Sequence, residues 1–290
     1  MSDFVILTDS SCDLPADLAR EKGIEYVPLT VRLDGKEYRN ELDESEISSK
    51  DFYDKLRNGA PVQTSAPTVQ EFEERIAAFA EKGQDVLYLG FSSALSATYN
   101  VGRSAIEAVR EKYPERKLLA VDTLCASLGE GLLVLLAEQQ RAKGKSIDEV
   151  AKYVEDTKLH LCHWFTVADL EHLRRGGRIS GASAMLGTLL QIRPLMHVND
   201  LGELKVVSKV RGQRAVLQRI VERVQQTAIE PQNQLMCISH GDCEDEAKLL
   251  RDMVAQSLGV KEFVISPVGP VIGAHSGPGT LAFFFLGNER

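Results

Sequence analysis

The sequence lacks the features that mark membrane, secreted or nucleic-acid-binding proteins. No apolar stretch reaches the roughly 18 residues needed to span a bilayer. The first residues, MSDFVILTDS, contain no basic start, long apolar run or cleavage site, so we expect no secretory signal. The net charge is -8 and the pI about 5.4, so the chain has no overall basic footprint of the kind that nucleic-acid binding requires.

Cysteines are few and follow no dense pattern. The chain has five of them, which is an odd number. Such usage fits a reducing compartment better than a disulfide framework, and we expect a cytoplasmic protein. The sequence also has no internal repeat and no low-complexity segment.

What is present is the composition of a soluble globular protein, with 43% hydrophobic and 26% charged residues. A chain of 290 residues predicts two domains, at about 100–200 residues per domain. We place the boundary near residue 160, which gives an N-terminal domain over 1–160 and a C-terminal domain over 161–290, with a ligand between them.

The first half alternates strand and helix patterns. Apolar runs predict strands, with an extended β-branched segment among them, and helical spacing follows each. The strands are expected over 4–8, 24–33, 85–91 and 117–122, and the helices over 46–56, 69–81, 101–112, 131–141 and 147–158. This pattern indicates an α/β domain with a parallel sheet covered on both faces. Ligands of such sheets lie at the carboxyl ends of the strands, where Asp9-Ser10-Ser11, Ser92-Ser93 and Asp122-Thr123 begin.

The second half is less regular and predicts an α+β domain with a mixed or antiparallel sheet. Two of its strands are joined by the hairpin-like turn Asn199-Asp200-Leu201-Gly202. The strands are expected over 161–167, 195–198, 204–207, 235–239, 263–267 and 280–287, and the helices over 169–175, 182–192, 214–226 and 244–258.

Two loops concentrate hydroxyl groups, Thr64–Thr68 and Ser92–Thr98, and each precedes a predicted helix. Hydroxyls and free backbone N–H groups at a helix N-terminus suit an anion. The alternative is simple N-capping, for which serine and threonine are favoured. A cap needs one hydroxyl and several are present, so we favour an anion site.

The second loop also imitates the nucleophile elbow of serine hydrolases. Gly90-Phe91-Ser92-Ser93-Ala94 departs from the G-x-S-x-G pattern only at its last position, and Asp122 and His275 follow in the hydrolase order. The elbow requires a helix directly after the serine, whereas residues 95–98 prolong this loop. A hydrolase that uses Ser92 is therefore the alternative hypothesis, and we do not expect an enzyme.

Two further patterns have a structural and a functional interpretation. Cys237-x-x-His240-x-x-Cys243 supplies three candidate metal ligands without an obvious fourth, and we expect no metal site. The basic segment 174–178 is either a solvated helix end or a patch for a phosphate or a partner. Lys205, Lys209, Arg211 and Arg214 would reinforce that patch.

The Gly- and Pro-rich segment Gly269–Gly279 is not a dinucleotide-binding motif, because it does not follow the G-x-G-x-x-G pattern. We interpret it as a tight backbone segment that presents His275.

These motifs together resemble the DegV family of bacterial fatty-acid-binding proteins, nearly from end to end. The resemblance rests on six segments of the chain: Thr8-Asp9-Ser10 with Asp13-Leu14, Thr64–Thr68, Ser92–Tyr99, Gly176–Ile179, Arg193-Pro194-Leu195 and Gly273–Gly279. It implies two domains that bury a long-chain fatty acid such as palmitate between them. The family's carboxylate contacts correspond to Thr64, Ser96 and His275, with Ser65 as their expected neighbour.

The chain departs from the family pattern at Ala97, where glycine is usual, and at Thr68, where serine is usual. Some members of the family present the acid to a separate fatty acid kinase. The resemblance implies that Arg178 and Arg211 contact such a partner.

A fatty-acid carrier needs an apolar tunnel. We expect its lining from the helix 184–192 and from parts of 263–272 and 283–285. Burying each CH₂ contributes about 0.8 kcal/mol, so a tail of roughly 15 carbons contributes on the order of 10 kcal/mol. Association offsets about 4 kcal/mol or more. The tail is thus expected to determine most of the affinity. The hydroxyl and histidine groups are expected to determine the orientation of the ligand.

Overall fold

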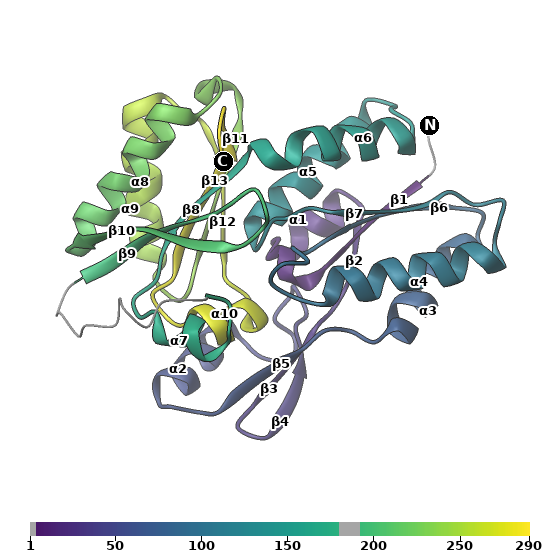
Figure 1. The fold of residues 1–290 in the computed structure, drawn as a ribbon, viewed down its shortest axis with the longest axis horizontal. Helices are drawn as coiled ribbons and strands as arrows, with labels where there is room; N and C mark the ends of the chain where they lie inside the picture. Colours follow the sequence, from purple (N-terminus) through teal and green to yellow (C-terminus); the bar gives the residue numbers. More distant parts are fainter. Residues whose placement is uncertain (1–3, 180–191) are drawn as a thin grey trace.

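The computed structural model describes residues 4–179 and 192–290. Across these two ranges the strands form three sheets (Figure 1). The N-terminal part contains a parallel sheet and the C-terminal part a mixed one, which confirms the predicted fold class. The helix expected over 182–192 falls outside the described residues except for Ile192, which opens a strand. No helix in these ranges is long and apolar enough to cross a bilayer.

The parallel sheet positions the polar loops at one edge. Its order is β2 (Ile24–Val27), β1 (Phe4–Asp9), β6 (Asp85–Gly90) and β7 (Leu118–Asp122). One face is covered by α3 (Val69–Ala80) and α4 (Thr98–Lys112), and the other by α5 (Leu128–Ala142) and α6 (Ile147–Thr157). The 3₁₀ turn η1 (Ser10–Cys12) and the helix α1 (Ala16–Glu21) follow β1. The predicted loops therefore leave the carboxyl ends of β1, β6 and β7.

The mixed sheet lies beside the parallel one. Its order is β10 (Leu204–Arg211), β9 (Ile192–Val198), β8 (Leu161–Thr166), β13 (Leu281–Leu286), β11 (Leu235–His240) and β12 (Glu262–Pro267). Only the pair of β11 and β12 is parallel among these described strands. The helices α8 (Gln213–Thr227) and α9 (Glu244–Leu258) pack on it, and α5 also contacts it (Figure 1).

One hydrophobic core joins the two sheets through α5. It contains Ile6 and Leu87 of the parallel sheet, Leu132 of α5, and Phe165 and Phe284 of the mixed sheet. The division at residue 160 stays a prediction, because this core is continuous across it.

A third, antiparallel sheet was not expected. It consists of β4 (Lys36–Arg39), β3 (Thr30–Leu33) and β5 (Val62–Ser65). The prediction of one extended segment over 24–33 was wrong, since Pro28 interrupts it and the chain changes sheets there. Proline cannot donate to a sheet's ladder of hydrogen bonds, which explains the break. The helix α2 (Ser49–Arg57) shares a core with this sheet.

The tight backbone segment Gly269–Gly279 is largely a short helix, α10 (Pro270–Ser276), which was not predicted as a helix. Pro270 occupies the first turn, where its missing N–H costs nothing. Gly273 is required because a Cβ there would lie 2.6 Å from Tyr53 Oη. Gly277, with a φ of 80°, ends the helix. Figure 1 shows α10 beside α7 (Glu171–Arg175), next to α2 and the small sheet.

Candidate functional site

A cavity of about 240 Å³ lies where the three sheets meet. The parallel sheet contributes Ser11 and Phe91 after its strands, and the small sheet contributes Thr64. Phe165 and Phe284 come from the mixed sheet. Residues that are far apart in the sequence thus line one cavity at the edge predicted to bind a ligand.

Most of the wall is apolar. Its hydrocarbon side chains come from the mixed sheet, from α7 and α10, and from the loops: Leu29, Phe91, Leu95, Phe165, Leu173, Val198, Leu204, Val268, Val271, Ile272 and Phe284. Such a wall offers an aliphatic chain the burial that drives its transfer from water.

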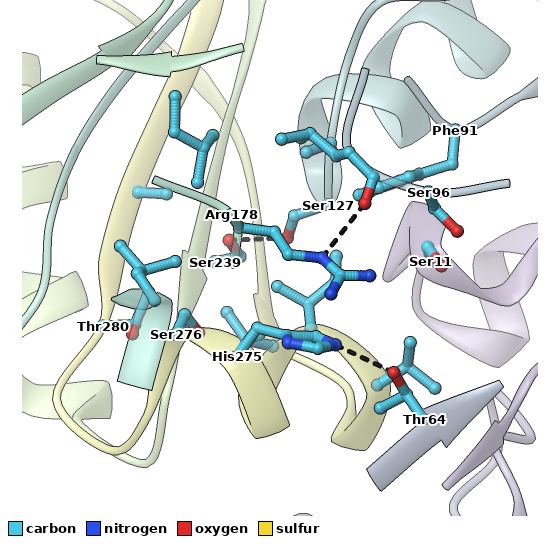
Figure 2. A pocket seen from close by; sticks show the side chains of 18 of the residues that line it. Ser11, Thr64, Phe91, Ser96, Ser127, Arg178, Ser239, His275, Ser276 and Thr280 are labelled. Carbon is cyan, nitrogen blue, oxygen red and sulfur yellow. Dashed lines mark hydrogen bonds between the residues drawn. The ribbon is translucent and has the colours of Figure 1, made fainter. Parts of the chain in front are cut away.

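Thr64 and His275 form a direct pair across the cavity wall. Thr64 Oγ1 lies 2.8 Å from His275 Nε2 (Figure 2). Burial, and next the positive charge of Arg178, lower the pKa of His275 to about 4. The imidazole is therefore neutral near pH 7. With the remaining ring proton on Nε2, His275 donates to Thr64, and the Thr64 hydroxyl can donate to an anion.

The packing of His275 leaves no room for a larger residue at position 176. A Cβ on Gly176 would lie 2.3 Å from His275 Nδ1. The glycine that ends α7 therefore allows the imidazole to approach the backbone closely. This contact fixes the ring against the segment that carries Arg178.

Arg178 brings a positive charge to the cavity wall, which the sequence did not predict. Its Nε donates to the backbone oxygen of Leu95 at 3.1 Å, and Nη1 donates to Gly176 O. Figure 2 shows the side chain between Ser127, Ser96 and His275. Burial lowers the pKa of the guanidinium from its ordinary value. Among the described residues that line the cavity, it is the only arginine or lysine.

Ser96 lies in the loop before α4 and also lines the cavity. Its Oγ accepts from the Thr98 backbone N–H at 3.3 Å and lies 2.9 Å from Thr98 Oγ1. When the Thr98 hydroxyl donates to Ser96, the proton of Ser96 is available to an anion. The cavity therefore offers hydroxyls of Thr64 and Ser96 together with one guanidinium.

Several other buried polar groups of the wall have partners of their own, whereas Ser276 Oγ has none among the described residues. His163 Nε2 accepts from the Ala126 N–H at 3.2 Å, and its Nδ1 lies 3.1 Å from Leu161 O. Ser127 Oγ lies 2.9 Å from Ser239 Oγ. Thr280 donates to Gly277 O. Because these groups are already paired, they place little demand on a ligand.

The structure therefore brings Thr64, Ser65, Ser96 and His275 together in one cavity wall. Thr64 and Ser65 belong to strand β5 rather than to a loop. Thr68 is a helix cap, as the simpler interpretation held, since it forms a capping box with Glu71 at the start of α3.

Other predicted positions fall elsewhere. Arg211 is exposed and lines a separate groove between β10 and α8 with Arg219 and Arg223. Of residues 283–285 only Phe284 lines the cavity, because side chains alternate along β13. From 263–272 the cavity takes Val268, Val271 and Ile272.

The hydrolase arrangement is not assembled. Ser92 is fully buried and donates to Gly202 O at 2.9 Å, while His275 pairs with Thr64. Asp122 accepts from the backbone N–H groups of Ser93 and Leu124. In the parts of the chain that the structure describes, no group of three metal-ligating side chains is placed to hold an ion.

Ser127, Ser239 and His163 also lie in the wall and were not predicted as site residues from the sequence. Ser127 directly precedes α5, at the edge where the other polar loops gather. This position in the sequence was the one indication that Ser127 could belong to the site. Ser239 and His163 lie on strands whose inward face can be assigned only once the sheet is known.

Known proteins share this architecture along the whole chain. The model of the DegV family, described as an uncharacterised protein family, matches residues 3–288. A DegV domain-containing protein of Clostridium perfringens is 43% identical over 290 residues, covering 100% of this chain and 99% of its own.

Two solved structures are also similar. A DegV lipid-binding protein of Thermotoga maritima is 31% identical, with a TM-score of 0.86 and coverage of 100% of both chains. A DegV family protein of Thermus thermophilus, described for its fatty-acid binding, is 34% identical with a TM-score of 0.85. Its match covers 97% of this chain and 98% of its own.

Proposed function

The chain belongs to the DegV family, and on that premise we propose that it binds a long-chain fatty acid without chemistry of its own. The observation that carries the proposal is the division of the cavity wall. An apolar space adjoins a cluster made of Arg178, His275 and the hydroxyls of Thr64 and Ser96. A hydrocarbon tail that ends in one anionic group has the matching chemistry. The Thermus relative described for fatty-acid binding supports this assignment.

In this proposal the carboxylate accepts from Thr64 and Ser96 and lies near the guanidinium of Arg178. Neutral His275 directs the Thr64 hydroxyl, and Ser65 is a neighbour at the margin. The acyl tail lies among Phe165, Phe284 and the other apolar side chains. The hydroxyls and the charge fix the orientation, while the tail contributes most of the affinity.

The double substitution Thr64→Val with Ser96→Ala tests the head-group assignment. Hydrogen bonds to a charged group contribute about 1.5–3 kcal/mol each, so the loss of two should weaken binding by about 100-fold or more. Both replacements keep the approximate volume of the side chain. Titration with a fluorescent fatty acid measures the effect. Thr68→Val is the control, since Thr68 caps α3 outside the cavity, and it should bind like the wild type. Unchanged affinity of the double variant would place the carboxylate elsewhere.

We further propose that the bound acid can be handed to a fatty acid kinase. Thr64, Arg178 and His275 also line an outer groove with His172 and Arg175. The proposed head group thus lies beside a basic surface that a second protein can reach. Arg211, the other residue that the family resemblance implicates, lies in a different groove. A partner that contacts both arginines would have to span two surfaces.

A further inference from the structure

A buried carboxyl group connects three of the segments that build the cavity. Asp13 follows η1 and is only 4% exposed. Its Oδ1 accepts from the Gly269 N–H at 3.0 Å, and its Oδ2 accepts from Ser127 Oγ. Gly269 is the cap residue of α10, the helix that carries His275, while Ser127 precedes α5. Asp13 thus joins the end of β1 to two elements of the binding site.

The turn that leads into α10 is held by hydrogen bonds on both sides, one of which runs from the Val268 N–H to His240 O at 2.8 Å. Pro270 has no N–H, so Gly269 is the donor that ties this turn to η1. Tyr53 Oη donates to Val268 O at 2.9 Å from the side of α2. The contact with Asp13 is also close, because a Cβ on Gly269 would lie 2.8 Å from Asp13 Oδ1. A change at Asp13 is therefore transmitted to α10.

Among the described residues, the titratable groups that face Asp13 include no cation. These groups are Asp9 of β1, Cys12 of η1, Glu130 of α5 and Tyr53 of α2. Arg20 lines the same outer cleft but pairs with Asp17, and its side chain is 73% exposed. Burial, opposed by the hydrogen bonds from Ser127 and Gly269, raises the pKa of Asp13 to about 7.

We propose that Asp13 is a positioning residue for the fatty-acid site, whose carboxylate holds α10 and His275 in place and whose protonation loosens the bound acid. This inference rests on the proposed function. An ionised carboxylate accepts a charge-assisted hydrogen bond from Gly269, and such bonds are roughly twice as strong as neutral ones. When the carboxyl is protonated, the hydrogen bond from Gly269 weakens, and the carboxyl O–H donates to Ser127 Oγ instead of accepting from it.

The effect passes through α10 rather than through the electric field of Asp13. Burial and the charge of Arg178 set the pKa of His275, and Asp13 is not among its causes. Binding should therefore weaken as the pH falls through the pKa of Asp13. Binding and protonation are thermodynamically linked. If protonation of Asp13 weakens binding tenfold, the bound ligand lowers the pKa of Asp13 by about one unit.

The test is the affinity for a fluorescent fatty acid between about pH 6 and pH 8, the range set by the pKa of Asp13. We expect the wild type to lose about fivefold to tenfold in affinity as the pH falls. Asp13→Asn keeps one acceptor for Gly269 but cannot ionise, so its affinity should be low and flat over this range. Asp17→Asn, at an exposed position on α1, should keep the wild-type profile. The titration is repeated with an alkyl sulfonate, whose head group stays ionised over this pH range. A change in its affinity then comes from the protein and not from protonation of the ligand.

Ser127→Ala supplies an independent test if Asp13→Asn does not fold. The Ser127 hydroxyl stabilises the ionised carboxyl, so its loss should move the midpoint of the profile to higher pH. A wild-type protein that binds equally well at all these pH values overturns the inference and leaves the proposed function intact. A profile that persists in Asp13→Asn overturns it too. No binding at any pH contradicts the proposed function itself.

Discussion

Replacing Arg178 by glutamine should weaken fatty-acid binding by about 100-fold, or roughly 3 kcal/mol. The guanidinium is the only arginine or lysine among the described residues of the cavity wall. Without it, the carboxylate of the ligand would be buried against hydroxyls and a neutral imidazole. Removing one partner of a buried charge pair leaves the other uncompensated, which costs more than the loss of one hydrogen bond.

Calorimetric titration with palmitate measures this effect. Arg174→Gln is the matched control, because Arg174 is exposed and pairs with Glu171 on α7. Its affinity should stay within about twofold of the wild type, as surface pairs contribute little. A fatty alcohol of the same length provides a control on the ligand, since it has no charge to compensate. Equal losses for the acid and the alcohol would show that Arg178 acts through packing rather than charge.

Affinity should rise steeply with the length of the acyl chain until the cavity is full. Each CH₂ that leaves water contributes about 0.8 kcal/mol, which is about fourfold in affinity. Going from ten to sixteen carbons should thus strengthen binding by about a thousandfold or more. This dependence follows from an apolar wall in which the polar groups His163, Ser127 and Ser239 already have partners.

A series of saturated acids of increasing length, measured by displacement of a fluorescent ligand, tests this prediction. Ala282→Phe adds a ring to the wall beside Phe284 and should move the plateau to shorter chains. Thr64→Val, which changes the head-group end, should lower every affinity by the same factor and leave the plateau where it is. Affinity that does not depend on chain length would mean that the tail lies outside the cavity.

The regular parts of the fold could be predicted because their signals are local. Apolar runs such as 4–8 and 85–91 have the length of buried strands, and the helices between them have clear spacing and caps. The segment 24–33 was predicted wrongly, and no helix was predicted over 269–279. The first changes sheets at Pro28, and the second forms a helix because α2, α7 and the small sheet pack around it. Pro28 marks the break within the first segment, but the sheet that each half joins depends on distant strands, just as the helix of the second segment depends on distant neighbours.

The same limit applies to the site. The resemblance to a family pointed to Thr64, Ser96 and His275, which lie in one cavity. Arg178 was expected at a partner surface, which stays a prediction, and its place in the cavity wall, where it contacts the backbone of Leu95, 83 residues earlier in the chain, was not expected. The burial of Asp9, Asp13 and Glu130 could not be predicted, since charged residues are seldom fully buried. Both findings depend on contacts between distant segments.

The most direct test of fatty-acid binding is a crystal structure of the protein incubated with palmitate. We expect elongated density in the cavity beside Phe165 and Phe284. Its forked end should lie within hydrogen-bond distance of Thr64 and Ser96 and beside the guanidinium of Arg178. An empty cavity at saturating palmitate, or a carboxylate bound away from these residues, would contradict the proposed function.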